Sequence, residues 1–182
     1  MEGLVKQNWK ETRKCFHKAA KQGSATAMYL LGEIFLHGNG VQVNTKEAFA
    51  WYRKAADNGN PSAAQKLSWC YLNGVGTRKN EEEGYTLLAT LGLIGDEEAL
   101  TLLRSAATSG NAAAELGMYY FYRDKIGNGC QQDIETAFQW ISLAVGSAHP
   151  AVMGHLQQLG LNLEYLGHGC QQYQQLQSRM AG

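Results

Sequence analysis

Four cysteines are the first residues whose chemistry could matter. They are separated by 55, 60 and 40 residues and form no C-x-x-C pair: Cys15, Cys70, Cys130 and Cys170. A zinc site needs ligands that converge at short spacings, and a disulfide framework is typical of short secreted chains. We therefore expect four reduced thiols and no bound metal.

The histidines and the one acidic run also form no catalytic pattern. No histidine has a Cys, Ser or carboxylate partner at a motif spacing: His17, His37, His149, His155 and His168. The run 81–83 begins an expected helix, where carboxylates stabilise the helix dipole. The chain contains no G-x-S-x-G, phosphate loop or H-E-x-x-H. We expect no catalytic residue and no cofactor. The alternative is an unrecognised enzyme or regulatory nucleotide-binding domain, which nucleotide or metal in the purified protein would favour.

The composition is that of a folded protein. Of 182 residues, 45% are hydrophobic and 18% are charged, which excludes a disordered chain. Lys plus Arg and Asp plus Glu are 16 each, so a globally basic nucleic-acid binder is not expected. No apolar stretch is long enough to span a membrane, and the first residues lack the apolar core of a signal peptide. We therefore expect a cytoplasmic protein.

Internal repetition is the strongest signal in the sequence. Segments that end in a small apolar pair recur along the chain, at Ala19-Ala20, Ala55-Ala56, Ala106-Ala107 and Ala144-Val145. The steps between them are 36, 51 and 38 residues. Apolar residues within the repeats follow helical spacing, and glycines stand where helix C-caps need positive φ. A period near 36 residues is typical of helix hairpins, which must stack because none buries its own apolar face.

One hairpin carries a family resemblance. Its first helix reads Ala27-x-x-x-Leu31-Gly32-x-x-Phe35-x-x-Gly38-x-Gly40-Val41, and its second reads Lys46-x-Ala48-x-x-Trp51-Tyr52-x-Lys54-Ala55-Ala56-x-x-Gly59. This pattern resembles the Sel-one-like repeat, a relative of the tetratricopeptide repeat. The next hairpin departs from it, with Ser68 in place of the glycine and Leu87-Leu88 in place of the Trp-Tyr pair.

The resemblance implies an all-α fold. We expect a right-handed α/α superhelix (solenoid) of about four helix-hairpin repeats, with an N-terminal capping helix and one inserted helix that accounts for the 51-residue step. We expect a single domain over 1–182. Its parts are a cap helix (1–23), repeat 1 (24–59), repeat 2 (60–95), the inserted helix (96–110), repeat 3 (111–148) and a degenerate C-terminal repeat (149–182).

Repeat 3 has two possible alignments. Matching Leu116-Gly117 to Leu31-Gly32 shortens the preceding turn by two residues. Matching from Ala114 keeps the turn and makes Met118 the core residue. The sequence leaves open which of the four aromatic residues at 119–122 point inward.

Repeat solenoids bind partners along a concave face that is lined by the first helix of each hairpin. Exposed positions transferred from the tetratricopeptide pattern are Tyr29, Glu33, Leu36, His37, Gln65, Trp69, Leu72 and Asn73, and in repeat 3, on the first alignment, Ala114, Met118, Phe121 and Tyr122. Aromatic residues such as these dominate binding hot spots. We expect Trp69 and Tyr29 to be exposed because they lie off the core stripe. The aromatics at core positions are expected to be buried: Trp51, Tyr52, Tyr71 and Trp140.

Charge is unevenly distributed along the chain. Residues 1–79 hold 12 Lys or Arg and 5 acids, whereas residues 80–182 hold 4 and 11. A solenoid would keep these halves apart and produce a dipole that steers a partner or favours head-to-tail association.

The resemblance implies a non-catalytic scaffold or adaptor that binds a protein or peptide in the concave groove, with no nucleic acid and no membrane span. An immunity protein that neutralises a cognate secreted toxin is the alternative. An adaptor would release its partner readily, whereas an inhibitor would hold it at nanomolar strength. A bacterial origin is our working hypothesis.

Overall fold

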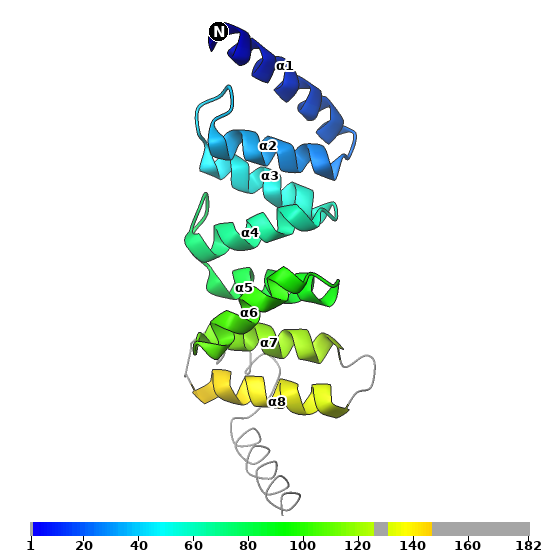
Figure 1. Ribbon diagram of the computed structural model, residues 1–182, viewed down its shortest axis with the longest axis vertical. Coiled ribbons are helices and arrows are strands. Elements are labelled where there is room, and N and C mark those ends of the chain that lie inside the picture. Colours follow the sequence, from blue (N-terminus) through cyan, green and yellow to red (C-terminus); the bar gives the residue numbers. More distant parts are fainter. Residues whose placement is uncertain (1, 126–130, 147–182) are drawn as a thin grey trace, which may run out of the picture. The chain divides into compact units, whose positions relative to one another are not determined.

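The computed structural model describes residues 2–125 and 131–146, with side chains described for 8–125 and 135–146. All elements in these ranges are α-helices, which confirms the predicted all-α helical-repeat fold (Figure 1). They are α1 (Glu2–Lys21), α2 (Ala25–His37), α3 (Thr45–Asp57), α4 (Pro61–Asn73), α5 (Glu81–Leu93), α6 (Glu97–Thr108), α7 (Ala112–Lys125) and α8 (Gln131–Gly146). No helix within the described residues is long and apolar enough to cross a membrane.

The 36-residue period fixes the ends of the helices. The bounds of α4 are those of α2 shifted by 36 residues, and the bounds of α5 are those of α3 shifted by 36. The link between the paired helices repeats as well. The amide of Asn44 donates to the Phe35 carbonyl at 2.9 Å, and the amide of Asn80 donates to the Tyr71 carbonyl at 2.9 Å. The two hairpins are therefore copies of one unit.

Side-chain caps begin six consecutive helices. In each, an oxygen of the N-cap side chain accepts a hydrogen bond from the amide three residues later, at 2.8–3.3 Å. Such a cap satisfies an amide that has no partner within the helix. The capping residues are Ser24, Asn44, Asn60, Asn80, Asp96 and Asn111.

The second glycine of each hairpin link lies against the preceding helix. Gly40 (φ 70°) packs on Trp9 of α1, and Gly76 (φ 73°) packs on Thr45 and Phe49 of α3. A Cβ at either glycine would collide with these atoms, and positive φ also disfavours other residues. Each hairpin is thus seated on the helix before it through a contact that only glycine permits.

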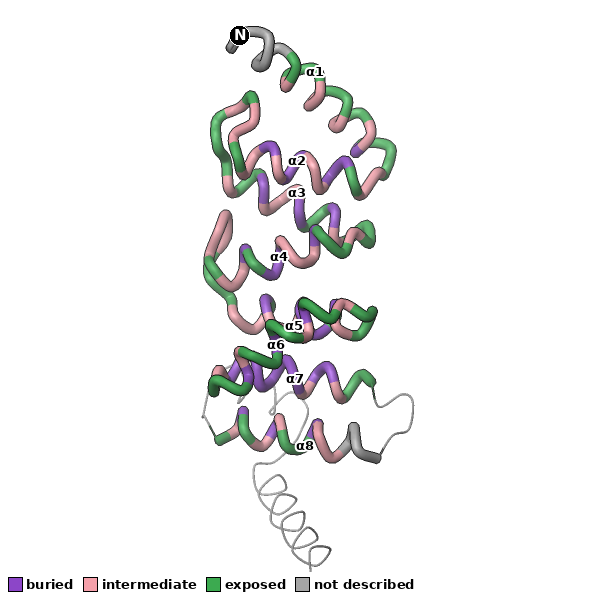
Figure 2. The backbone as a smooth tube through the Cα atoms, in the orientation of Figure 1, coloured by how far each residue is buried: buried purple, intermediate pink, exposed green. Residues whose placement is uncertain are grey.

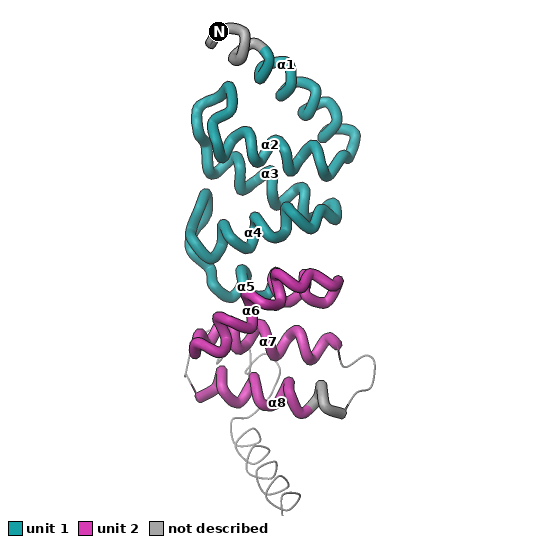
Figure 3. The backbone as a smooth tube through the Cα atoms, viewed as in Figure 1, with its two compact units in different colours: residues 1–87 teal, residues 88–182 magenta. Residues whose placement is uncertain are grey.

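The chain forms two compact units, residues 1–87 and 88–182 (Figure 3). In unit 1, α1 packs on the first hairpin as the sequence predicted for a capping helix. Phe16 and Ala20 of α1 join Met28, Leu31 and Ala55 in one hydrophobic cluster. A second cluster contains Ala48, Tyr52, Leu67 and Cys70. Figure 2 colours the buried positions of α2, α3 and α4 purple.

Unit 2 contains the helix that the long step of the repeat predicted. It is α6, capped by Asp96, and α7 follows it after a short turn. Every residue of α7 from Ala112 to Met118 is buried. Leu116 and Tyr120 pack with Ile141 and Ala144 of α8.

The cap of α7 decides the alignment of repeat 3. Ala114 donates its amide to the Asn111 side chain, as Ala63 does to Asn60. Counted from the caps, Met118 occupies the position of Leu67 and Leu31. This is the second of the two alignments, and all three residues are buried. Of the aromatic run, Tyr120 and Phe121 are buried, and Tyr119 and Tyr122 are half-buried.

Residue 32 determines how α3 approaches α2. A Cβ at Gly32 would lie 2.5 Å from Cε1 of Tyr52, so the buried phenol ring occupies the space that a side chain would fill. In the next hairpin the equivalent positions hold Ser68 and Leu88. At these two positions of the repeat, glycine and a large ring in the first hairpin are therefore replaced by serine and a smaller aliphatic chain in the second.

A double-mutant cycle at positions 32 and 52 tests the contact between Gly32 and the Tyr52 ring. We expect Gly32→Ser alone to lower the free energy of unfolding by about 1–3 kcal/mol, because overpacking outweighs the gain in helix propensity. Combined with Tyr52→Leu, the same change should cost at least about 1 kcal/mol less than the sum of the single effects. Urea denaturation followed by circular dichroism measures all four proteins. Strict additivity would contradict the contact.

The two cysteines in the described residues are free thiols of opposite exposure, Cys15 exposed and Cys70 buried. Burial raises the pKa of Cys70 to about 11. Because the thiolate is the reactive form, iodoacetamide at pH 8 should alkylate Cys15 in the native protein and spare Cys70 until denaturant is added. Mass spectrometry of the tryptic peptides checks this, and equal labelling of the two under native conditions would contradict it.

Candidate functional site

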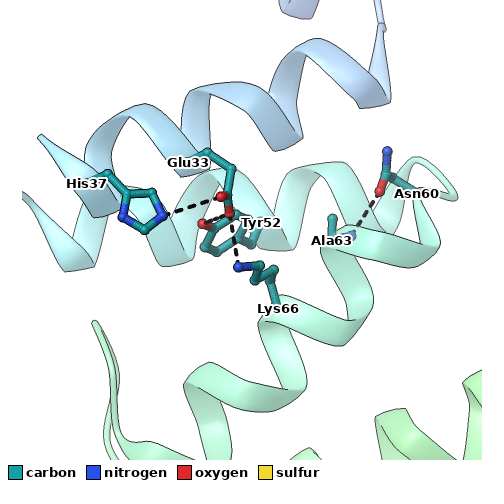
Figure 4. Close-up of polar contacts among 6 residues, drawn as sticks. All are labelled: Glu33, His37, Tyr52, Asn60, Ala63 and Lys66. Atoms are coloured by element: carbon teal, nitrogen blue, oxygen red, sulfur yellow. Dashed lines mark hydrogen bonds and ion pairs between the residues drawn. The ribbon is translucent and has the colours of Figure 1, made fainter. Parts of the chain in front are cut away.

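The candidate site is a face of unit 1 formed by the first helices of its hairpins. We call it the A-helix face and define it by Tyr29, Glu33 and His37 of α2, and Lys66 and Trp69 of α4. The three residues of α2 are spaced by four, so they lie on one side of that helix. Side chains from α2, α3 and α4 meet at its centre (Figure 4).

Glu33 is the centre of this arrangement. The hydroxyl of Tyr52 donates a 2.5 Å hydrogen bond to Oε1 of Glu33. Nζ of Lys66 lies 3.4 Å from the same oxygen, and Nε2 of His37 lies 3.4 Å from Oε2. The Glu33 side chain is 24% exposed, so these contacts form at the edge of the core. One carboxylate therefore connects three helices.

Tyr52 is the buried anchor of the network. Its side chain is fully buried, and its ring lies 5.9 Å from that of Tyr29. Burial and the hydrogen bond to Glu33 raise its pKa far above the ordinary value for tyrosine. The phenol consequently keeps its proton and serves as a permanent donor that orients the Glu33 carboxylate.

Trp69 is the large exposed apolar residue of the A-helix face. It is 43% exposed, as its position off the core stripe predicted. The amide of Asn73, one turn later, donates to the Trp69 carbonyl at 2.8 Å. Tyr29 was also expected to be exposed, but it is half-buried, because it packs against both clusters of unit 1.

Several other expected binding residues have structural contacts. Leu36 packs against the cluster around Tyr52, and Leu72 packs at Gly84 of α5. Gln65 is half-buried and makes a polar or electrostatic interaction. These residues border the A-helix face.

The residues expected to bind a partner in repeat 3 do not form an exposed row. Met118 is 1% exposed and Phe121 is 7% exposed, so the expectation that they face a groove is corrected. The cap at Asn111 gives the reason, since Phe121 falls on the core position of Ile34. Ala114 is buried as well. Tyr122 is half-buried, with its ring edge-on to Phe121 at 5.1 Å.

Sequence reasoning missed two members of the network. Lys66 reaches Glu33 across helices, and nothing in its local sequence distinguishes it from other surface lysines. Tyr52 was assigned to the core, where it lies, but its hydroxyl bond to Glu33 was not foreseen. Glu33 and Tyr52 are 19 residues apart in the sequence, and they come into contact only because α2 and α3 pack together.

The A-helix face offers aromatic, charged and hydrogen-bonding side chains. Within the described residues, no group of three or more His, Cys, Asp or Glu side chains is placed to hold a metal ion. The A-helix face offers the exposed indole of Trp69 on α4 and, from α2, the Glu33 carboxylate, which the Tyr52 hydroxyl and Lys66 hold in place. Such a surface can bury an apolar side chain and pair with donors at its rim.

Comparison with known proteins places the chain in a family. The Sel1 repeat matches residues 1–24, 25–60, 61–89, 96–111 and 110–145, well over half of the sequence. The chain therefore belongs to the Sel1 repeat family, whose members generally serve as protein–protein interaction scaffolds. No curated protein matches the sequence at a significant level.

Two solved structures are similar. One is a protective antigen present in uropathogenic Escherichia coli strains that displays an SLR fold, with 25% identity over 83% of this chain and a TM-score of 0.42. This chain spans only 37% of that antigen's length. The other is a Sel1 repeat protein from Oxalobacter formigenes, with 23% identity, coverage of 80% of this chain and 96% of that one, and a TM-score of 0.44.

The network predicts unequal effects of two truncations. Tyr52→Phe removes a buried hydrogen bond to a charged group and should lower the free energy of unfolding by about 1–3 kcal/mol. His37→Ala removes a more exposed contact with Glu33, which is an ion pair only when the imidazole is protonated, and should cost less than about 1 kcal/mol. Thermal unfolding of both variants beside Tyr29→Phe, which leaves the network intact, decides the point. Equal losses for all three would contradict a special role for Tyr52.

Proposed function

We propose that this protein is a non-catalytic scaffold that binds a partner protein or peptide on the A-helix face of unit 1. The exposure of Trp69 is the observation that carries the proposal. Tryptophan is the residue most enriched at binding hot spots, where it is buried on association. Glu33 and Lys66 of the same face supply a carboxylate and an ammonium group, which suit a polar rim.

The network beneath this surface supports the same function. Glu33 is held by Tyr52 and Lys66, so it loses little conformational freedom when it meets a partner. A binding surface whose charged groups are already ordered loses less conformational entropy on association. Free thiols at Cys15 and Cys70 accord with a cytoplasmic location for such a protein.

Site-specific photocrosslinking in the source organism tests where the partner binds. Trp69→p-benzoylphenylalanine places the reactive group on the A-helix face. The matched control is Phe138→p-benzoylphenylalanine in α8, since Phe138 is also an exposed aromatic residue, at 54%. We expect a protein adduct from position 69 that position 138 does not give. Identical adducts from both positions would count against the site.

Affinity for the partner so identified provides the quantitative test. Trp69→Ala should weaken Kd by about 30-fold or more, the effect of removing a 2 kcal/mol hot spot. Phe138→Ala should leave Kd unchanged. Calorimetry on the purified pair measures both, and a change of less than twofold for Trp69→Ala would overturn the proposal. A nanomolar Kd together with inhibition of the partner would identify an immunity protein, and a weaker Kd an adaptor.

A further inference from the structure

A cleft of about 480 Å³ lies beside α1 in unit 1. Five of its lining residues come from α1 and one from α2: Arg13, Lys14, His17, Lys18, Lys21 and Phe35. We call it the basic cleft. No carboxylate lines it, and it shares no residue with the A-helix face.

The surroundings of the basic cleft are positively charged. Of its lysines, Lys14 is paired with Glu11 at 2.9 Å. The pKa of His17 is lowered by burial and by the charges of Arg13, Lys21 and Lys54, with only Glu47 acting in the opposite direction. Unit 1 as a whole has 12 Lys or Arg and 8 Asp or Glu. An anion that enters the cleft would therefore be attracted.

The indole N–H of Trp51 is a buried hydrogen-bond donor next to His17 and Lys54. The rings of Trp51 and His17 meet edge to face, with their centroids 5.3 Å apart. Nζ of Lys54 lies over the Trp51 ring, 4.5 Å from its centroid. Its indole nitrogen is buried and has no hydrogen-bond partner among the described residues. Indole N–H can only donate, and the ring that carries it packs against His17 of the cleft.

The arrangement of the cations favours an extended acidic segment. Arg13 and Lys21 are eight residues apart on one helix, which separates them by about 12 Å along its axis. An extended peptide covers that length with about four residues. A single phosphate, by contrast, would be matched by cations that converge on one point.

Two other polyanionic surfaces fit less well. A lipid surface would need the apolar side of α1, but Phe16 and Ala20 are packed in the core and Trp9 lies on Gly40. A nucleic acid would need residues that stack on bases or read their edges. The two rings that line the cleft already have packing partners, since Phe35 is half-buried against the second cluster of unit 1 and half-buried His17 meets Trp51.

We propose that the basic cleft binds a run of aspartate and glutamate side chains in an extended segment of a partner protein. The carboxylates pair with Arg13, Lys18 and Lys21 along α1. Because these contacts are solvent-exposed, binding should weaken steeply as salt is raised.

The test is fluorescence anisotropy with the full chain and a labelled eight-residue peptide of alternating Glu and Asp, at 50 mM NaCl and pH 7.5. The cleft variant is Arg13→Gln/Lys18→Gln/Lys21→Gln. The control is Lys46→Gln/Arg53→Gln/Arg78→Gln, which removes three exposed cations of unit 1 outside the cleft. We expect the cleft variant to bind at least tenfold more weakly than wild type and the control to stay within threefold.

Three results would overturn the proposal. They are equal weakening by both triple variants, no preference of wild type for the acidic peptide over a Gln/Asn peptide of the same length, and tighter binding of an eight-nucleotide oligo-dT. Circular dichroism checks that the variants fold. Should the cleft variant lose helicity, Lys18→Glu/Lys21→Glu, which leaves half-buried Arg13 in place, gives the same readout with the same expected loss.

Discussion

The ring of Tyr52 lies against α2 because residue 32 has no side chain. This close approach brings the phenol hydroxyl to Glu33, and Glu33 in turn meets Lys66 of α4. Packing, the order of the carboxylate and the alignment of three helices therefore share one origin. A side chain at position 32 would disturb all of them together, since interiors this dense transmit small displacements.

Much of the fold could be predicted from the sequence because the repeat specifies it locally. The 36-residue period places the ends of α2 to α5, and capping residues and positive-φ glycines mark the helix boundaries. The exposure of Trp69 also follows from its place off the apolar stripe. Such features depend on neighbours in the chain, which a single sequence displays.

The predictions that were wrong or missing depend on the alignment of repeat 3 with the other repeats and on contacts between residues far apart in the sequence. Met118 and Phe121 were assigned to an exposed face through an alignment two residues out of step, and the cap at Asn111 places both on core positions. The pairing of Lys66 with Glu33 requires α2 and α4 to be neighbours of α3, which no local spacing reveals. The uneven charge was evident, but its concentration in a cleft along α1 required the structure.

The glycine contacts at Gly40 and Gly76 bear on how such a chain grows. Each hairpin brings with it the glycine that seats it on the helix before and a second helix on which the next glycine can sit. Duplicating 36 codons therefore copies a complete junction, and no new interface has to be invented. Unequal crossing-over between such copies can lengthen or shorten the protein in whole steps, whereas a change of another length, such as the 51-residue step between Ala55 and Ala106, leaves a visible break in the series.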